Sequence, residues 1–235
     1  MAEEEPVFKT TTGPPRIITA ASLFDGHDAA INVMRRLIQS AGAEVIHLGH
    51  DQSAKAVVDC AIQEDAHGVA LTSYQGGHVE YFTYIRQLLD EAGCEHIRIF
   101  GGGGGTITPP EIKTLHESGI SKIYSPDDGR TMGLMGMIHH LMDIASEVDL
   151  IHPDRVASLS GPVTPDDTAK VGLLLTMSES ADDATFKATL DKCRSSEKEI
   201  PVIGFTGTGG AGKSSLLDEL MLRILRDNPG KKVCL

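Results

Sequence analysis

Residues that could bind a metal-containing ligand are grouped in three short segments in the first half of the chain. Asp25-Gly26-His27 is the first, Ser73 to Gly77 is the second, and Gly101 to Gly105 is the third. Each segment directly follows a predicted β-strand, and open parallel sheets bind ligands beyond the carboxyl ends of their strands. A histidine on one segment and side-chain-free backbone on the other two predict a large, flat ligand whose metal His27 can reach.

Asp25 and His27 have the spacing of a metal-binding imidazole and its supporting carboxylate. An aspartate that accepts the N–H of one ring nitrogen fixes the tautomer and makes the other nitrogen a better metal ligand. Asp25 is equally suited to cap the helix that follows, so the pair alone does not establish a metal site.

The other two segments could bring backbone close to a ligand. The Ser73 hydroxyl can hydrogen-bond a ligand that the backbone of Gly76 and Gly77 approaches closely, although a simple turn is the alternative. The third segment consists of Gly101, Gly102, Gly103, Gly104 and Gly105. Such a run costs conformational entropy, and a turn needs only one or two glycines. We therefore expect something bulky to occupy the space of the missing side chains, with a phosphate-binding loop as the alternative.

Short apolar runs alternate with longer amphipathic stretches and predict an α/β fold. Strands are expected at residues 16–20, 44–48, 69–72, 97–100 and 122–124, and helices at 29–41, 53–64, 79–92, 109–118 and 131–147. The strands lack polar alternation, as expected when both faces of a sheet are covered. We predict a doubly wound, flavodoxin/Rossmann-like parallel five-stranded sheet with strand order 2-1-3-4-5. This order places all three segments along one crevice.

The chain divides by composition into four parts. We expect a mobile arm at 1–15, the ligand-binding domain at 16–150, a linker at 151–199 with a helix at 182–193, and a second domain beginning at 200. In this last part, 201–205 is a predicted strand, a helix is expected to end near 226, and another strand starts at 231. The sheet would be unfinished, so we expect a fragment of a longer protein.

The bulk composition limits the classes of partner. A net charge of −12 and an aromatic content of 4% without tryptophan disfavour nucleic-acid binding. The four cysteines are far apart, which favours a reducing, cytoplasmic location over a disulfide scaffold. No signal peptide is evident, and no apolar run is long enough to span a membrane, so we expect no membrane partner.

A phosphate-binding loop of the form GxxxxGK[ST] stands between the predicted strand at 201–205 and the helix that follows. The candidate nucleotide-binding residues are Gly207, Gly209, Gly210, Ala211, Gly212, Lys213, Ser214 and Ser215. Backbone N–H groups of such a loop surround phosphates; Lys213 would contact the β- and γ-phosphates and Ser214 would bind Mg²⁺. The carboxylate and the water-positioning residue that an NTPase needs for hydrolysis would lie further along the chain. We therefore expect little hydrolysis by this chain.

Together, Asp25-Gly26-His27, Ser73 and the glycine run resemble the cobalamin-binding motif DxHxxG…SxL…GG. The spacing matches, with 42 residues between Ala30 and Ser73. Over residues 16–150 the chain resembles the cobalamin domain of adenosylcobalamin-dependent acyl-CoA mutases. The resemblance implies that His27 ligates cobalt, Asp25 supports it, Ser73 meets the displaced benzimidazole, and Gly101 to Gly105 make room for the nucleotide tail.

Three positions depart from the family pattern. Ala30 replaces the motif glycine, Gln75 replaces its leucine, and Ala21 stands where these mutases commonly have lysine. Gln75 is kept as a candidate contact to the cofactor because of its place in the motif.

The segment from Gly204 to Leu222 resembles the P-loop of the G-protein chaperones that service these mutases. A cobalamin domain followed by a G domain resembles the fused isobutyryl-CoA mutases. The resemblance implies a radical isomerisation of isobutyryl-CoA to n-butyryl-CoA, GTP and Mg²⁺ as further ligands, and homo-oligomers of the intact protein. The remainder of the G domain and a substrate-binding barrel would follow, and this chain alone would be inactive.

Three other interpretations remain open from the residues. One is a corrinoid methyltransferase module, which also ligates cobalt through histidine. Another is a P-loop NTPase with a non-corrinoid regulatory domain. The third is a receiver- or flavodoxin-like binding module, although the glycine run argues against a receiver.

Overall fold

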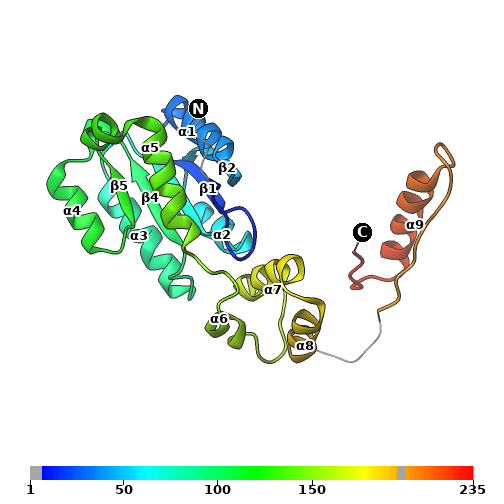
Figure 1. Cartoon of the computed structure of the whole chain (residues 1–235). Helices are drawn as coiled ribbons and strands as arrows, with labels where there is room; N and C mark the ends of the chain where they lie inside the picture. Colours follow the sequence, from blue (N-terminus) through cyan, green and yellow to red (C-terminus); the bar gives the residue numbers. More distant parts are fainter. Residues whose placement is uncertain (1–6, 195–199, 235) are drawn as a thin grey trace, which may run out of the picture. The chain divides into compact units, whose positions relative to one another are not determined.

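The computed structural model describes residues 7–194 and 200–234. It divides into two compact units, residues 1–195 and 196–235 (Figure 1). The three segments predicted to bind a ligand all lie in the first unit.

The first unit is built on a parallel sheet of five strands. They are β1 (Arg16–Ser22), β2 (Glu44–Gln52), β3 (Gly68–Thr72), β4 (Arg98–Gly102) and β5 (Lys122–Tyr124). The order β2-β1-β3-β4-β5 confirms the predicted one. It makes β3 the neighbour of both β1 and β4, so the loops after these three strands lie at one edge of the sheet.

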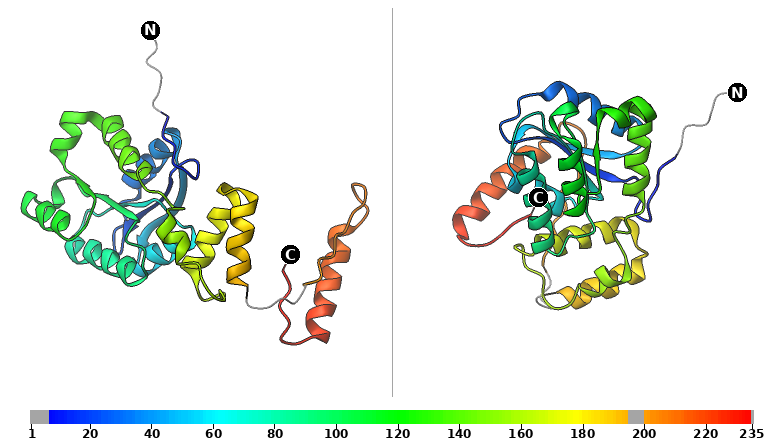
Figure 2. Two further views of the ribbon diagram at one scale, coloured as in Figure 1. Left: turned by 60° about the horizontal axis from the view of Figure 1, so that its bottom comes forward. Right: turned by 90° about the vertical axis from the view of Figure 1, so that its left-hand side faces the viewer.

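Helices cover both faces of the sheet (Figures 1 and 2). One face carries α1 (Asp28–Ser40) and α5 (Pro126–Ser146), and the other carries α2 (Ala54–Gln63), α3 (His78–Glu91) and α4 (Pro109–Glu117). Successive strand residues point to opposite faces. Ile17 accordingly packs in the α1/α5 core and Ile18 in the α2/α3/α4 core, both without solvent exposure.

Several element ends differ from the prediction in ways that affect the site. The strand β2 continues four residues beyond 48, to Gln52. The strand β4 includes Gly101 and Gly102, so the glycine run begins inside the sheet, and a short 3₁₀ helix (Gly104–Thr106) follows. Helix α5 begins at Pro126 rather than 131 because Ser125 and Asp128 form a capping box, and Gly133 interrupts it at φ 68° and ψ 173°.

The expected mobile arm is wrong for residues 7–15; residues 1–6 lie outside the described part. Phe8 is only 9% exposed and packs in the α1/α5 core beside His139. Thr10 and Gly13 form a β-bridge. The Thr11 hydroxyl donates to Asp149 at 2.7 Å. One apolar residue and these hydrogen bonds attach the segment to the domain.

The expected linker is largely helical over its described part, 151–194; residues 195–199 are not described. It forms α6 (Pro153–Ala157), α7 (Thr168–Ser180) and α8 (Asp183–Cys193), of which only α8 was predicted. These helices share a small core of Leu159, Leu173, Met177 and Cys193. Gly172 lets α7 approach the end of α2, because a Cβ there would lie 2.9 Å from the Ile62 carbonyl oxygen. Proline and serine mark the turns between short helices here.

The second unit contains α9 (Lys213–Asp227). The strands predicted at 201–205 and from 231 are absent from residues 200–234, and Leu235 lies outside the described part. A strand needs a neighbouring strand for its hydrogen bonds, and the described residues of this unit supply none. Within the described ranges, no helix is both long and apolar enough to cross a bilayer.

Candidate cobalamin-binding site

Asp25 and His27 form a hydrogen-bonded pair just beyond the end of β1. The His27 Nδ1 atom lies 2.7 Å from Asp25 Oδ1. The Asp25 side chain has no solvent exposure, whereas that of His27 is 72% exposed. With Nδ1 facing the carboxylate, Nε2 is the ring nitrogen available to a ligand. This is the arrangement of a metal-binding imidazole whose tautomer is fixed by aspartate.

Asp25 is held by backbone as well as by the imidazole. Its Oδ1 also accepts the His27 N–H at 3.0 Å, and its Oδ2 accepts the Tyr74 N–H at 2.7 Å. Burial alone would raise the pKa of Asp25, but the hydrogen bonds from Tyr74 and His27 outweigh it and lower that pKa. Asp25 is thus a buried carboxylate that joins the first two segments. The capping alternative is not what the structure shows, because His27 is the N-cap of α1 and makes no side-chain cap.

Ser73 connects the first and third segments. The Ser22 hydroxyl donates to Ser73 Oγ at 2.8 Å, and the Ser73 N–H donates to the Gly102 carbonyl at 2.9 Å. Ser73 is 1% exposed. The hydroxyl proton of Ser73 is therefore available to a group that enters between the loops after β1, β3 and β4.

The glycine run has two different explanations along its length. A Cβ at Gly101 would lie 2.4 Å from Cζ of Phe82, and one at Gly103 would lie 1.9 Å from the Ser73 carbonyl oxygen. At these two positions the protein's own atoms fill the space, which corrects the expectation that a ligand does so along the whole run. At Gly102 the only heavy atom within 4 Å of a Cβ would be the Tyr124 carbonyl oxygen, at 3.5 Å. The ligand explanation therefore survives at Gly102.

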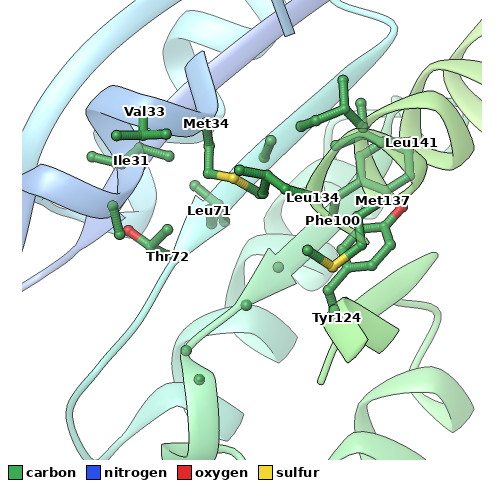
Figure 3. A pocket seen from close by; sticks show the side chains of 18 of the residues that line it. Ile31, Val33, Met34, Leu71, Thr72, Phe100, Tyr124, Leu134, Met137 and Leu141 are labelled. Carbon is green, nitrogen blue, oxygen red and sulfur yellow. The ribbon is translucent and has the colours of Figure 1, made fainter. Parts of the chain in front are cut away.

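An apolar cavity of about 550 Å³ lies between α1 and α5 above the ends of β3, β4 and β5 (Figure 3). Gly101 to Gly104 contribute to its wall. Figure 3 shows Val33 and Met34 on the α1 side facing Leu134 and Met137 on the α5 side. Phe100 of β4 also lines the cavity. The cavity has the size and apolar lining of sites for extended small molecules.

The remaining predicted residues do not line the cavity. The Gln75 side-chain amide donates to the Leu23 carbonyl, so it ties the second segment to the first. Gly77, at φ 83°, is the N-cap of α3, and Gly76 precedes it. A Cβ at Gly26, Gly76 or Gly105 would meet no heavy atom within 4 Å. The structure thus brings the three segments together, but it gives Gly76 and Gly77 the role of a helix-starting turn.

Sequence analysis missed Tyr74. Its ring lines the cavity, lies 5.5 Å from that of His27 between centroids, and packs within 3.3 Å of where a Gly104 Cβ would be. Its position directly after Ser73 was the available signal. Met137 of α5 also contributes to the cavity wall.

In the second unit, the residues predicted to form a phosphate loop run from Gly207 into the first turn of α9. Gly210 and Gly212 have φ of 74° and 78°. The Lys213 ammonium donates to the Gly207 and Thr208 carbonyls at 2.9 and 2.8 Å. Ser214 and Ser215 lie in the first turn of the helix, where N–H groups lack intrahelical partners.

Comparison with known proteins identifies the first unit. Residues 15–123 match the B12 binding domain family. The chain is 48% identical over 227 residues to a fused isobutyryl-CoA mutase of Geobacillus kaustophilus, covering 94% of this chain and 21% of that protein. It is 50% identical over 212 residues to another from Cupriavidus metallidurans, covering 90% of this chain and 19% of that protein. The chain therefore spans about a fifth of the length of these relatives.

A shorter relative is covered along most of its length. It is the small subunit of 2-hydroxyisobutanoyl-CoA mutase from Aquincola tertiaricarbonis, 34% identical over 115 residues, covering 48% of this chain and 82% of the subunit. These matches favour a cobalamin domain over a receiver or a non-corrinoid regulatory domain. With its five-stranded parallel sheet and its match to B12 binding domains, the chain belongs to the family of cobalamin-binding domains of acyl-CoA mutases.

Proposed function

We propose that this chain binds adenosylcobalamin with the benzimidazole displaced and His27 in its place as the lower ligand of cobalt, the base-off/His-on mode. The observation that carries the proposal is the buried Asp25 carboxylate, which holds Nδ1 of an exposed His27 and leaves Nε2 free. Among the described residues, no cluster of three or more His, Cys, Asp or Glu could hold a metal. A single protein donor suffices for cobalt that a corrin ring already surrounds.

The cavity supports the same mode of binding. Displacement of the benzimidazole leaves a nucleotide tail that needs a site of its own, and the space between α1 and α5 is open and apolar, with Gly102 in its wall. Ser73 donates its N–H to the carbonyl of this same Gly102. The Ser73 hydroxyl would donate to the benzimidazole nitrogen, while Gly102 leaves the cavity unfilled. The residues present therefore fit the cofactor.

We propose that in the intact protein the cofactor would supply radical chemistry for the isomerisation of isobutyryl-CoA to n-butyryl-CoA. The remainder of the G domain and a substrate-binding barrel would belong to the same protein, which would form a homo-oligomer. The residues of this chain bind and orient the cofactor. We expect no isomerase activity from the chain alone.

A visible-absorbance titration with adenosylcobalamin tests the cofactor proposal. The wild-type chain should give the base-off/His-on spectral change, and His27→Ala should lose it. His50→Ala is the matched control, because His50 is another exposed histidine, near the end of β2. A spectrum unchanged by the wild-type chain, or a change that persists in His27→Ala, would contradict His27 as the cobalt ligand.

The second unit supports a separate proposal, nucleotide binding. The loop from Gly207 to Gly212, Lys213 and the helix start offer the groups that hold phosphates, and Ser214 would bind Mg²⁺ in the intact G domain. Titration with a fluorescent GTP analogue and Mg²⁺ should show binding that Lys213→Ala weakens, without hydrolysis. Equal binding by the variant would refute the loop's role. The corrinoid methyltransferase alternative gains no support from the mutase relatives.

A further inference from the structure

Phe24, directly before Asp25, combines two unfavourable features. Its φ is +62°, a left-handed conformation in which Cβ crowds the following carbonyl and which bulky residues rarely adopt. Its side chain is also 79% exposed, so the ring gains little burial from the described chain. Glycine or asparagine would suit this backbone better.

The surrounding structure holds Phe24 in this conformation. The strands β1 and β2 end side by side, with Ser22 paired to Gln52, so Asp51 lies next to the loop after β1 and its Oδ1 accepts the Phe24 N–H at 2.5 Å. Asp51 itself has φ +62°, but aspartate tolerates this region. On the other side, the Gln75 amide binds the Leu23 carbonyl. The strained backbone is therefore held from β2 on one side and from the loop after β3 on the other.

Backbone strain that a structure maintains is associated with functional sites, and the Phe24 ring lies in solvent, where a ligand outside this chain can reach it. The proximity of Phe24 to His27 identifies the contact. Leu23, 36% exposed, and Phe24 immediately precede the Asp25–His27 pair, and the His27 ring is itself exposed. A flat ligand held by His27 covers the surface around that residue.

We propose that Phe24 contacts the cofactor, with its ring packed against the carbon framework of the corrin macrocycle whose cobalt His27 would ligate. The inference rests on the proposed cobalamin function and deepens it. Phe24 would then add affinity without affecting which atom ligates the cobalt. The backbone strain is retained because replacement by a residue that suits the backbone would remove the ring.

Replacement of Phe24 by residues that suit a positive φ tests the proposal. In Phe24→Gly and Phe24→Asn, relief of strain should leave the Tm of the unliganded chain unchanged or raise it by up to about 4 °C. Loss of the ring should raise the Kd for adenosylcobalamin by about tenfold or more, the value of burying one aromatic side chain. The His-on spectrum at saturation should persist, because Asp25 and His27 are unaltered.

Two further variants complete the experiment. Phe24→Tyr keeps a ring and should stay within about twofold of the wild-type Kd. Tyr84→Ala, at a half-exposed aromatic on α3, should also leave the Kd unchanged. Wild-type affinity in both Phe24→Gly and Phe24→Asn would overturn the contact while leaving the role of His27 intact. Absence of binding by the wild-type chain would instead overturn the proposed function, and this inference with it.

Discussion

Gly102 provides a direct test of the apolar cavity, because a side chain there would enter it. Phe100 and Gly102 are two residues apart in β4, so they lie on the same face of the sheet, and both line the cavity. Gly101, between them, lies on the opposite face, where its Cβ would point at Phe82. A Cβ at Gly102 would lie 3.5 Å from the Tyr124 carbonyl oxygen, an ordinary contact. Gly102→Val should therefore fold without a clash and place its methyl groups in the open space.

The expected magnitude follows from two contributions. Replacing a glycine inside a strand recovers roughly 0.5–1 kcal/mol of backbone entropy. Burial of a valine side chain contributes about 1.5–3 kcal/mol when complete, and here it is partial because the cavity is open. The free energy of unfolding should therefore rise by about 1–3 kcal/mol. The nucleotide tail of cobalamin must share the cavity with this valine side chain. If the crowding costs about 1–3 kcal/mol, the Kd for adenosylcobalamin increases by about 5- to 150-fold.

Urea unfolding of the unliganded chain and an absorbance titration with adenosylcobalamin measure the two effects. Gly103→Ala is the contrasting variant, because its Cβ would lie 1.9 Å from the Ser73 carbonyl oxygen. It should destabilise the unliganded protein by about 1–3 kcal/mol or more. A Gly102→Val variant that binds cobalamin as tightly as wild type would refute the cavity as the tail site. Equal stability of Gly103→Ala and wild type would refute the explanation of the glycine run.

Three further predictions concern the unliganded chain. Asp25→Asn should lower the free energy of unfolding by about 1–3 kcal/mol, because one amide oxygen cannot accept every donor from Tyr74 and His27; urea unfolding that matches wild type would contradict this. Burial, with nearby Arg16 and Arg155, lowers the pKa of His67 from 6.5 to about 4. The neutral His67 therefore contributes to the free energy of unfolding fully above pH 6.5, and this contribution, up to about 3 kcal/mol, is lost as the pH falls toward 4. His67→Asn should flatten the dependence of the free energy of unfolding on pH between these two values. Gly133→Ala should destabilise the chain by about 1–3 kcal/mol, since φ 68° with ψ 173° is essentially restricted to glycine; an unchanged or raised Tm would instead mean that α5 straightens.

The sheet and its strand order could be predicted because the pattern is local. Each buried strand is a short apolar run, and each helix has its own periodicity and terminal signals. Parallel strands joined by helices leave few topologies, and strand order alone then brought Asp25, Ser73 and Gly102 to one edge. The segment at 151–194 was misjudged because α6 and α7 are short helices whose stability comes from packing around Leu173 and Met177, which local composition does not reveal.

Part of the site depended on contacts between distant residues. Asp25 reaches the Tyr74 N–H, Asp51 reaches the Phe24 N–H, and Phe82 packs where Gly101 has no side chain. None of these pairs is adjacent in sequence, so neither spacing nor propensity could indicate them. The arm at 7–15 was misplaced for the same reason, because a single buried Phe8 and a few hydrogen bonds hold it.

Local residue types and spacing were enough to predict the order of strands and helices, the resemblance to a cobalamin motif, and His27 as the candidate ligand. Only the folded chain shows which nitrogen of His27 faces away from Asp25, where the cavity lies, and which glycines border it. Those features arise from packing between elements far apart in the chain, where a difference of an ångström separates a filled position from an open one.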